Sequence, residues 1–187
     1  EGWFPGELGG RAVADVLFGD YNPGGRLPIT VPKSVGQLPI YYNQKPSAIH
    51  RYVAESENPL FNFGFGLSYT KFEYSNLTLS STEIKKDGEL KVSVDVKNVG
   101  NLDGDEVVQL YVNDVYSSVT TPEKTLRGFK RLNIKKGETK TVTFTLTDKE
   151  LGFYDNEGNY LVEPGTFKIM VGGSSDKGLE SGFEIKE

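Results

Sequence analysis

Residues 90–96 read Leu-Lys-Val-Ser-Val-Asp-Val, an unbroken alternation of apolar and polar side chains. Successive side chains of a β-strand point to opposite faces, so this alternation predicts a strand with one buried face. The same pattern occurs in four other stretches, near residues 72–79, 108–112, 142–146 and 167–171. Turn signals separate the stretches, at 86–88, 99–101, 136–137, 156–159 and 164–165. Residues 68–187 are therefore predicted to form an antiparallel β-sandwich domain.

The overall composition agrees with a fold made mainly of strands and turns. The 187 residues include 22 glycines, 9 prolines, 10 tyrosines and 11 phenylalanines, but only one methionine and one tryptophan. Glycine and proline favour turns, and aromatic side chains favour strands. A chain of this length can form one substantial core, or one domain together with part of another.

Residues 1–33 carry a helical pattern instead. The run Glu7–Phe18 places apolar side chains on one helix face, and Gly19 follows as a stop signal. A turn and a short apolar run at 26–31 come next, which predicts a helix, loop and strand from the edge of an α/β sheet. Nothing nearby in the sequence covers these apolar faces, so residues 1–33 are predicted to be the C-terminal end of a larger α/β domain. Four apolar side chains of the helix are then expected to be partly exposed, namely Leu8, Val13, Val16 and Leu17.

Residues 34–67 show little periodicity but contain many aromatic and proline residues. A stretch of this length without regular structure is usually functional or packed as a linker. Its aromatic content argues against a disordered tether. We expect this linker to be pinned against the segments on both sides of it.

Charge and residue types exclude several classes of function. Lysine and arginine total 21 against 26 acidic residues, so there is no basic surplus for binding nucleic acid. No apolar stretch approaches the roughly 20 residues that a membrane helix needs, and no membrane partner is expected. The chain has no cysteine and a single histidine, which cannot supply a usual zinc ligand set. No metal and no cofactor are expected.

The candidate catalytic residues also have simpler interpretations. His50 lies in an aromatic-flanked loop with no Gly-x-Ser-x-Gly motif to supply a nucleophile, so it has a structural role, a surface role or a ligand contact. Glu7, Asp15 and Asp20 could form an acid and base pair. The helix dipole accounts for Glu7 in the first predicted turn, and Asp20 suits a turn. The residues by themselves therefore indicate no enzyme.

The acidic stretch Asn101-Leu102-Asp103-Gly104-Asp105-Glu106 superficially suggests a calcium loop. It lacks the glycine at the sixth place and the glutamate at the twelfth, where Val112 stands. A turn between strands with solvated carboxylates is the favoured interpretation.

Two longer runs are more specific. Trp3-Phe4-Pro5-Gly6-Glu7 and the run at 14–28, Ala-Asp-Val-Leu-Phe-Gly-Asp-Tyr-Asn-Pro-Gly-Gly-Arg-Leu-Pro, closely resemble the end of the second domain of glycoside hydrolase family 3 enzymes, the β-glucosidases and β-xylosidases. The run at 59–72, Pro-Leu-Phe-Asn-Phe-Gly-Phe-Gly-Leu-Ser-Tyr-Thr-Lys-Phe, resembles the segment that leads into their fibronectin type III-like domain. Stretches resembling strand motifs of that domain follow at 96–100, 104–112, 126–129 and 164–167.

The resemblance implies a parent protein that is a retaining exo-β-glycosidase hydrolysing terminal β-linked sugars. That chemistry needs two carboxyl groups about 5 to 5.5 Å apart. In the family, the nucleophilic Asp comes from an N-terminal barrel and the acid/base Glu from an earlier part of the second domain. The chain begins after both, so no catalytic residue is expected in it, and Glu7 is not assigned that role.

The expected partners are the N-terminal catalytic portion of the same enzyme and, in the intact enzyme, a β-linked oligosaccharide or glycoside. This chain alone is expected to be inactive and to have a structural, stabilising role. The linker passes between domains, so its residues His50, Arg51 and Tyr52 are expected near the mouth of the active site.

An alternative is an independent carbohydrate-binding or protein-interaction module. Sugar-binding sandwiches often expose aromatic side chains on one face. Here Phe129, Tyr154 and Phe167 fall in strand patterns for which core packing is the default interpretation. The glycosidase interpretation is therefore favoured, since the sandwich alone does not explain residues 1–33.

Overall fold

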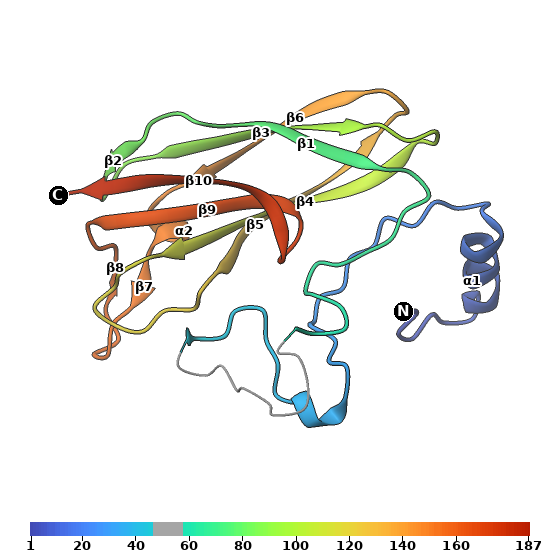
Figure 1. The fold of residues 1–187 in the computed structure, drawn as a ribbon, viewed down its shortest axis with the longest axis horizontal. Coiled ribbons are helices and arrows are strands. Elements are labelled where there is room, and N and C mark those ends of the chain that lie inside the picture. Colours follow the sequence, from blue (N-terminus) through green and yellow to red (C-terminus); the bar gives the residue numbers. More distant parts are fainter. Residues whose placement is uncertain (47–57) are drawn as a thin grey trace.

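The computed structural model describes residues 1–46 and 58–187, in which two β-sheets face each other across one core (Figure 1). The smaller sheet has three strands in the order β1 (Phe72–Leu79), β3 (Leu90–Asn98) and β6 (Thr139–Leu146). The larger sheet has five, in the order β2 (Glu83–Lys85), β10 (Lys177–Lys186), β9 (Gly165–Ser174), β4 (Gly104–Asp114) and β5 (Thr125–Ile134). All pairs are antiparallel except β2 with β10, which is parallel. The mainly β fold class predicted from the sequence is confirmed.

The core contains the apolar positions that the alternation predicts. The inward side chains of β3 and of β6 are buried, as are those of β9 and those at 108, 110 and 112 in β4. The register Val92↔Phe144 and Val94↔Val142 places the buried side chains of β3 directly beside those of β6. Burial of apolar surface on this scale is the main contribution to the stability of the sandwich.

Other elements follow no simple alternation. In β5 the inward position opposite Leu110 is Gly128, because a Cβ there would lie 2.9 Å from the ring of Phe144. A single helical turn, α2 (Asp148–Leu151), begins at Thr147 with a capping box that involves Glu150. A small hairpin of β7 (Phe153–Tyr154) and β8 (Tyr160–Leu161) follows it.

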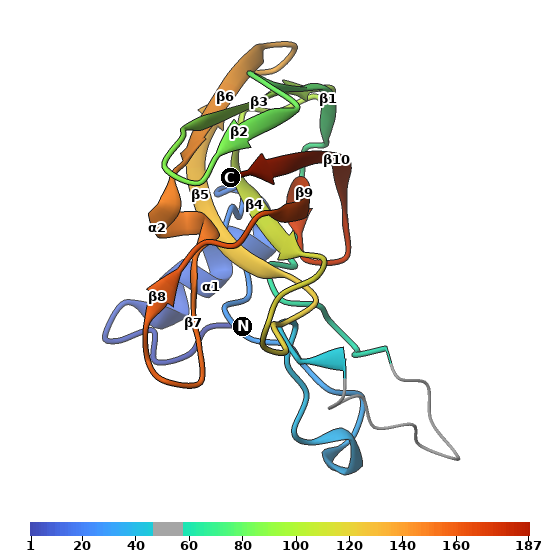
Figure 2. The same ribbon diagram turned by 90° about the vertical axis from the view of Figure 1, so that its left-hand side faces the viewer.

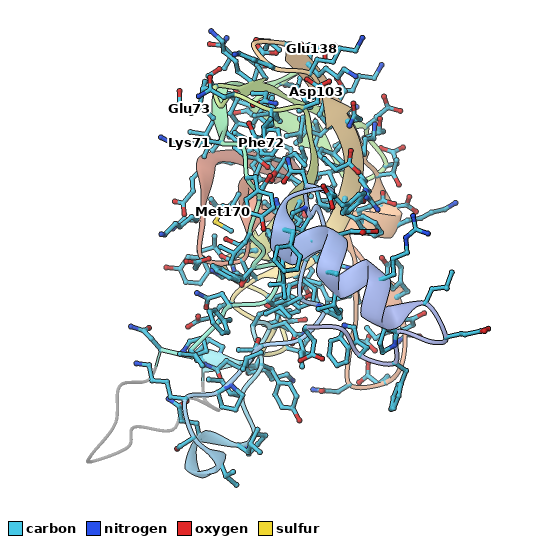
Figure 3. All side chains as sticks on the ribbon, turned by 90° about the vertical axis from the view of Figure 1, so that its right-hand side faces the viewer. Lys71, Phe72, Glu73, Asp103, Glu138 and Met170 are labelled. Atoms are coloured by element: carbon cyan, nitrogen blue, oxygen red, sulfur yellow. The ribbon has the colours of Figure 1, made fainter. Side chains whose placement is uncertain are left out.

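The N-terminal helix is shorter than predicted. Helix α1 spans Gly9–Phe18, so Glu7 precedes it and does not lie in its first turn. It ends at Gly19, whose φ of 88° is the left-handed conformation of a helix stop. Figure 3, viewed toward α1, shows no described segment in front of the helix. Leu8 is 70% exposed and Leu17 is 71% exposed. Val13 is also exposed and Val16 is half-buried, so the apolar face of the helix is uncovered, as expected.

The predicted strand at 26–31 is wrong. Only Val31 forms a β-bridge, with Phe61 of the linker. The backbone of Leu27 also pairs with the linker, donating to Phe65 at 2.9 Å and accepting from Gly64 at 2.8 Å. A regular ladder does not form because Pro28 has no N–H to donate. A 3₁₀ turn, η1 (Val35–Gln37), adds the only helical turn in the described part of the linker.

One buried carboxyl group in the sandwich makes stability depend on pH. Both side-chain oxygens of Asp114, at the end of β4, are buried without a hydrogen-bond partner of normal geometry in the described residues. The pKa of Asp114 is raised to about 6, mainly by burial and to a smaller extent by the charge of Glu163, while the backbone of Tyr116 opposes the shift. The pKa of Asp114 in the folded chain lies above the ordinary value of 3.8. The contribution of protonated Asp114 to folding stability is therefore complete below pH 3.8 and is lost as the pH rises through 6.

Asp114→Asn removes the charge while keeping the shape. We expect this variant to melt about 2–4 °C above the wild type at pH 7.5 and to show no gain at pH 3.5. Thermal unfolding followed by circular dichroism across this range measures the difference. An equal shift at both pH values would show that ionisation of Asp114 is not responsible.

None of the helices in the described ranges is long and apolar enough to cross a membrane.

Candidate functional site

A buried ion pair joins the N-terminal region to the sandwich. Glu106 occupies an inward position of β4, two residues before Val108, and is only 3% exposed. Its Oε2 accepts a hydrogen bond from Nη2 of Arg26 at 2.5 Å, and its Oε1 accepts one from the hydroxyl of Tyr74 in β1 at 2.7 Å. We call these three residues the joint cluster. It connects the turn after α1 to both sheets at the edge of the core.

Burial and the neighbouring charges shift the pKa values of Glu106 and Tyr74 in the joint cluster. Burial raises the pKa of Glu106, and the Arg26 guanidinium and the Tyr74 hydrogen bond oppose that shift. Burial and the neighbouring carboxylate raise the pKa of Tyr74, so its hydroxyl stays protonated and donates. A buried ion pair adds little net stability, because both charges lose their hydration when the chain folds. Removing one partner is nevertheless strongly destabilising, because the other charge is then buried and unpaired. The arrangement is suited to holding two segments together.

A second set of hydrogen bonds holds the turn that follows α1. The side chain of Asn22 donates to the carbonyl of Asp103 at 2.9 Å and accepts from the hydroxyl of Ser68 at 2.9 Å and the N–H of Tyr69 at 2.8 Å. The hydroxyl of Tyr69 donates to the carbonyl of Val16 in α1 at 2.6 Å. The single Asn22 side chain therefore ties the N-terminal region to both the β3–β4 turn and the start of the sandwich.

The linker is seated on the outer face of the larger sheet. Tyr42 stacks on Phe63 with ring centroids 4.1 Å apart and meets the ring of Tyr111 edge-on at 5.9 Å. The buried amide of Gln109 donates to the carbonyls of Gly64 at 3.3 Å and Gly173 at 2.6 Å. Figure 2 shows the linker extending from the sandwich on the side of this sheet. The described part of the linker is thus pinned against the sandwich, as its aromatic content indicates.

The described sequence-based candidates Glu7, Asp15 and Asp20 do not belong to the joint cluster. His50, Arg51 and Tyr52 fall outside the described residues, so their expected place near an active site stays a prediction. Glu7 and Asp20 are exposed, and Asp15 forms a surface ion pair with Arg11 at 3.8 Å. Within the described ranges, no group of three His, Asp or Glu side chains could hold a metal ion.

The predicted turn of solvated carboxylates at 101–106 is wrong in its last three residues. Gly104–Glu106 begins β4, where Glu106 points inward and Asp105 outward. The hydrogen bond from Asn133 and the charge of Arg131, 2.5 Å away, hold the pKa of Asp105 below its usual range. The signal for Glu106 was present in the sequence, since it continues the inward spacing of the apolar positions at 108, 110 and 112.

Two of the three aromatic side chains assigned to the core are also placed differently. Phe167 is buried at 1% exposure, but Phe129 is 67% exposed and Tyr154 is 68% exposed. Phe129 faces outward because Gly128 holds the inward position beside Phe144. Tyr154 lies on the small β7–β8 hairpin, outside the two main sheets, and packs edge-on against Tyr160.

The chain is similar to known proteins over nearly its whole length. Residues 1–69 match the glycosyl hydrolase family 3 C-terminal domain, and residues 106–175 match the fibronectin type III-like domain. The chain is 44% identical over 196 residues to a periplasmic β-glucosidase of Salmonella typhimurium, covering 99% of this chain and 26% of the relative. It is 49% identical over 179 residues to a β-xylosidase of Formosa agariphila, covering 94% of this chain and 25% of the relative.

The chain corresponds to the C-terminal part of family 3 glycoside hydrolases. A crystal structure of the Listeria innocua β-glucosidase in complex with glucose superposes with a TM-score of 0.95 at 35% identity, over 100% of this chain and 28% of that one. The chain spans about a quarter of the length of the family 3 relatives that it matches.

The family boundaries show what the joint cluster connects. Arg26 lies in the stretch that matches the family 3 C-terminal domain, and Glu106 is the first residue of the stretch that matches the fibronectin type III-like domain. Asn22 and Gly64 lie in the first stretch, and Gln109 lies in the second. The finer division into a domain end at 1–33, a linker at 34–67 and a sandwich from 68 stays a prediction.

Proposed function

We propose that this chain is the structural, non-catalytic portion of a retaining exo-β-glycosidase that removes terminal β-linked glucose or xylose. The full-length relatives named above are β-glucosidases and a β-xylosidase, and the alignment with them covers nearly the whole chain. A retaining mechanism needs a carboxylate nucleophile and a second carboxyl group as acid and base. We place both in the part of the relatives that this chain does not span.

The role proposed for the chain is to lock the fibronectin type III-like domain onto the end of the preceding domain. The buried pair of Arg26 and Glu106 carries this proposal, because it is desolvated and spans the two family domains. Pairs on the protein surface contribute little, whereas a buried charge cannot lose its partner without a large cost. The joint cluster therefore fixes one relative position of the two segments.

The proposed partner is the catalytic portion of the same enzyme. Helix α1 exposes three large apolar side chains, Val13, Leu17 and the 84% exposed Phe18, and its N-cap residue Leu8 is also exposed. Apolar surface of this kind marks a protein interface more often than a solvent face. We infer that the preceding part of the α/β domain covers this side of the helix.

The loop of His50, Arg51 and Tyr52 is proposed to lie near the mouth of the active site, where it would contact the substrate. Alanine substitutions in the full-length enzyme should then change kcat/KM differently for glucosides and xylosides. Unchanged specificity constants for several glycosides would remove this part of the proposal.

Hydrolysis of p-nitrophenyl β-glucoside and β-xyloside tests the main proposal. The full-length parent protein should hydrolyse at least one of the two, and this chain alone should hydrolyse neither. Turnover by the chain alone would show that a catalytic carboxyl pair lies within it. A full-length protein inactive toward these and other β-glycosides would contradict the proposed activity.

A further inference from the structure

A pocket lined in part by the three residues of the joint cluster has a further wall that the proposed function does not use. It has a volume of about 480 Å³ and lies between the linker, the start of β1 and the β9–β10 turn. Pockets of roughly 300–1,000 Å³ are the usual size for small ligands. Its walls include Phe61, Asn62 and Phe65 of the linker, Lys71 just before β1, Asp176 of the β9–β10 turn, and Lys177, the first residue of β10.

One wall of this pocket is aromatic. Phe61 and Phe65 stack with ring centroids 4.9 Å apart and planes 29° from parallel. Phe61 is 39% exposed, so part of its surface is in contact with solvent. The backbone holds Phe61 in place, since it donates to the carbonyl of Val31 at 3.2 Å and accepts from the N–H of Val31 at 2.9 Å. The aromatic wall is therefore formed before any ligand binds.

Polar groups with unused hydrogen-bonding capacity stand next to this wall. The side-chain amide of Asn62 and the ammonium of Lys177 have no side-chain partner among the described residues, although both line the pocket. The amide offers a donor and an acceptor, and the ammonium offers three donors. Lys71 is paired with Glu73 at 3.4 Å, and Arg26 is paired with Glu106, so much of the positive charge is neutralised. The ligand favoured by this environment is neutral, with an apolar face and a polar rim.

We propose that this pocket binds a pyranose unit of a saccharide. The apolar C–H face of the sugar packs on Phe61, and its hydroxyl groups bond to Asn62 and Lys177. The inference goes beyond the proposed function, because binding by this chain needs no catalytic group. Failure to bind sugar would leave the proposed glycosidase role untouched.

Titration of the ¹⁵N-labelled chain with cellobiose and with xylobiose, followed by amide chemical shifts, tests the proposal. At least one of the two should give saturable shifts confined to residues around 60–66, 71–74 and 173–177, with a Kd of roughly 1 mM. Phe61→Ala should weaken binding about tenfold or more, equivalent to about 1.4 kcal/mol. Asn62→Ala and Lys177→Ala should each weaken it several-fold, and neither removes a hydrogen bond that the fold uses.

Phe129→Ala is the matched control, because it removes an exposed aromatic ring that does not line the pocket. It should leave the Kd unchanged. The absence of saturable shifts with either sugar would overturn the proposal, as would equal weakening by Phe129→Ala. Binding of inorganic phosphate without binding of sugar would also overturn it, since the lysines would then form an anion site.

Discussion

Arg26→Met is expected to lower the free energy of unfolding of the chain by about 3–5 kcal/mol at pH 7. Methionine keeps much of the length of the arginine side chain but leaves the 3% exposed Glu106 without its cation. The hydrogen bond from Tyr74 remains and compensates only in part. Urea unfolding followed by circular dichroism measures the loss, with the slope of the unfolding curve as a check that the denatured state is unchanged.

The deficit of Arg26→Met should shrink as the pH falls. Without its cation, the buried Glu106 has a folded pKa above its ordinary 4.5, so its contribution to stability is present below pH 4.5 and is lost as pH rises. Arg26→Met combined with Glu106→Gln should be more stable than Arg26→Met alone at pH 7, because the double variant buries no unpaired charge.

Lys71→Met is the control for the Arg26 experiment, because it breaks the exposed pair with Glu73, whose two side chains are 75% and 58% exposed. It should change stability by less than about 1 kcal/mol. If Arg26→Met costs no more than Lys71→Met, the joint cluster does not lock the two segments together.

Gly64→Ala is expected to destabilise the chain by about 2–4 kcal/mol. Gly64 has a φ of 80°, which an L side chain rarely adopts, and an added Cβ would overlap the amide of Gln109. Gln109 is buried between Gly64, Gly173 and the hydroxyl of Tyr111, so it cannot move aside without losing these hydrogen bonds. The linker must then lift from the sheet or the sandwich must shift. Urea unfolding measures the cost, and hydrogen exchange of the linker amides shows whether the linker has lifted.

Gly158→Ala separates backbone strain at positive φ from the overlap of an added Cβ with a neighbouring side chain. Gly158 has a φ of 87° in an exposed turn, and nothing lies within 4 Å of its added Cβ. It should therefore cost only the conformational strain, about 1–2 kcal/mol. Equal losses for the two variants would show that the contact between Gly64 and Gln109 does not hold the linker.

The sandwich could be predicted from the sequence because its strands satisfy one local rule. In β3 each inward position from Leu90 to Val96 is apolar and buried, so the period of two is visible without knowledge of the partner strand. In β5 the rule fails, because the inward position at Gly128 is filled by the ring of Phe144 from the opposite sheet. That compensation depends on a residue 16 positions away, and no local pattern records it. Because Gly128 occupies the inward position, the next residue, Phe129, points outward.

The N-terminal region shows a second limit of local patterns. Residues 26–31 have the composition of a strand, but they form only one β-bridge, between Val31 and Phe61 of the linker. Pro28 has no N–H to donate, so a regular ladder with the linker does not form. The joint cluster is not predicted from the sequence, because three acidic residues in six are typical of a solvated turn. Only the spacing of Glu106 from Val108 distinguished it, and its partner Arg26 lies 80 positions away.

We propose that this chain is an inactive portion that completes a β-glycosidase. Mixing the chain with the remaining N-terminal portion of its parent, and assaying p-nitrophenyl β-glucoside and β-xyloside, tests that claim most directly. We predict hydrolysis by the mixture, none by this chain alone, and protection of the α1 amides from hydrogen exchange on mixing. A mixture that assembles, as shown by comigration on a sizing column, yet hydrolyses neither compound would contradict this proposal.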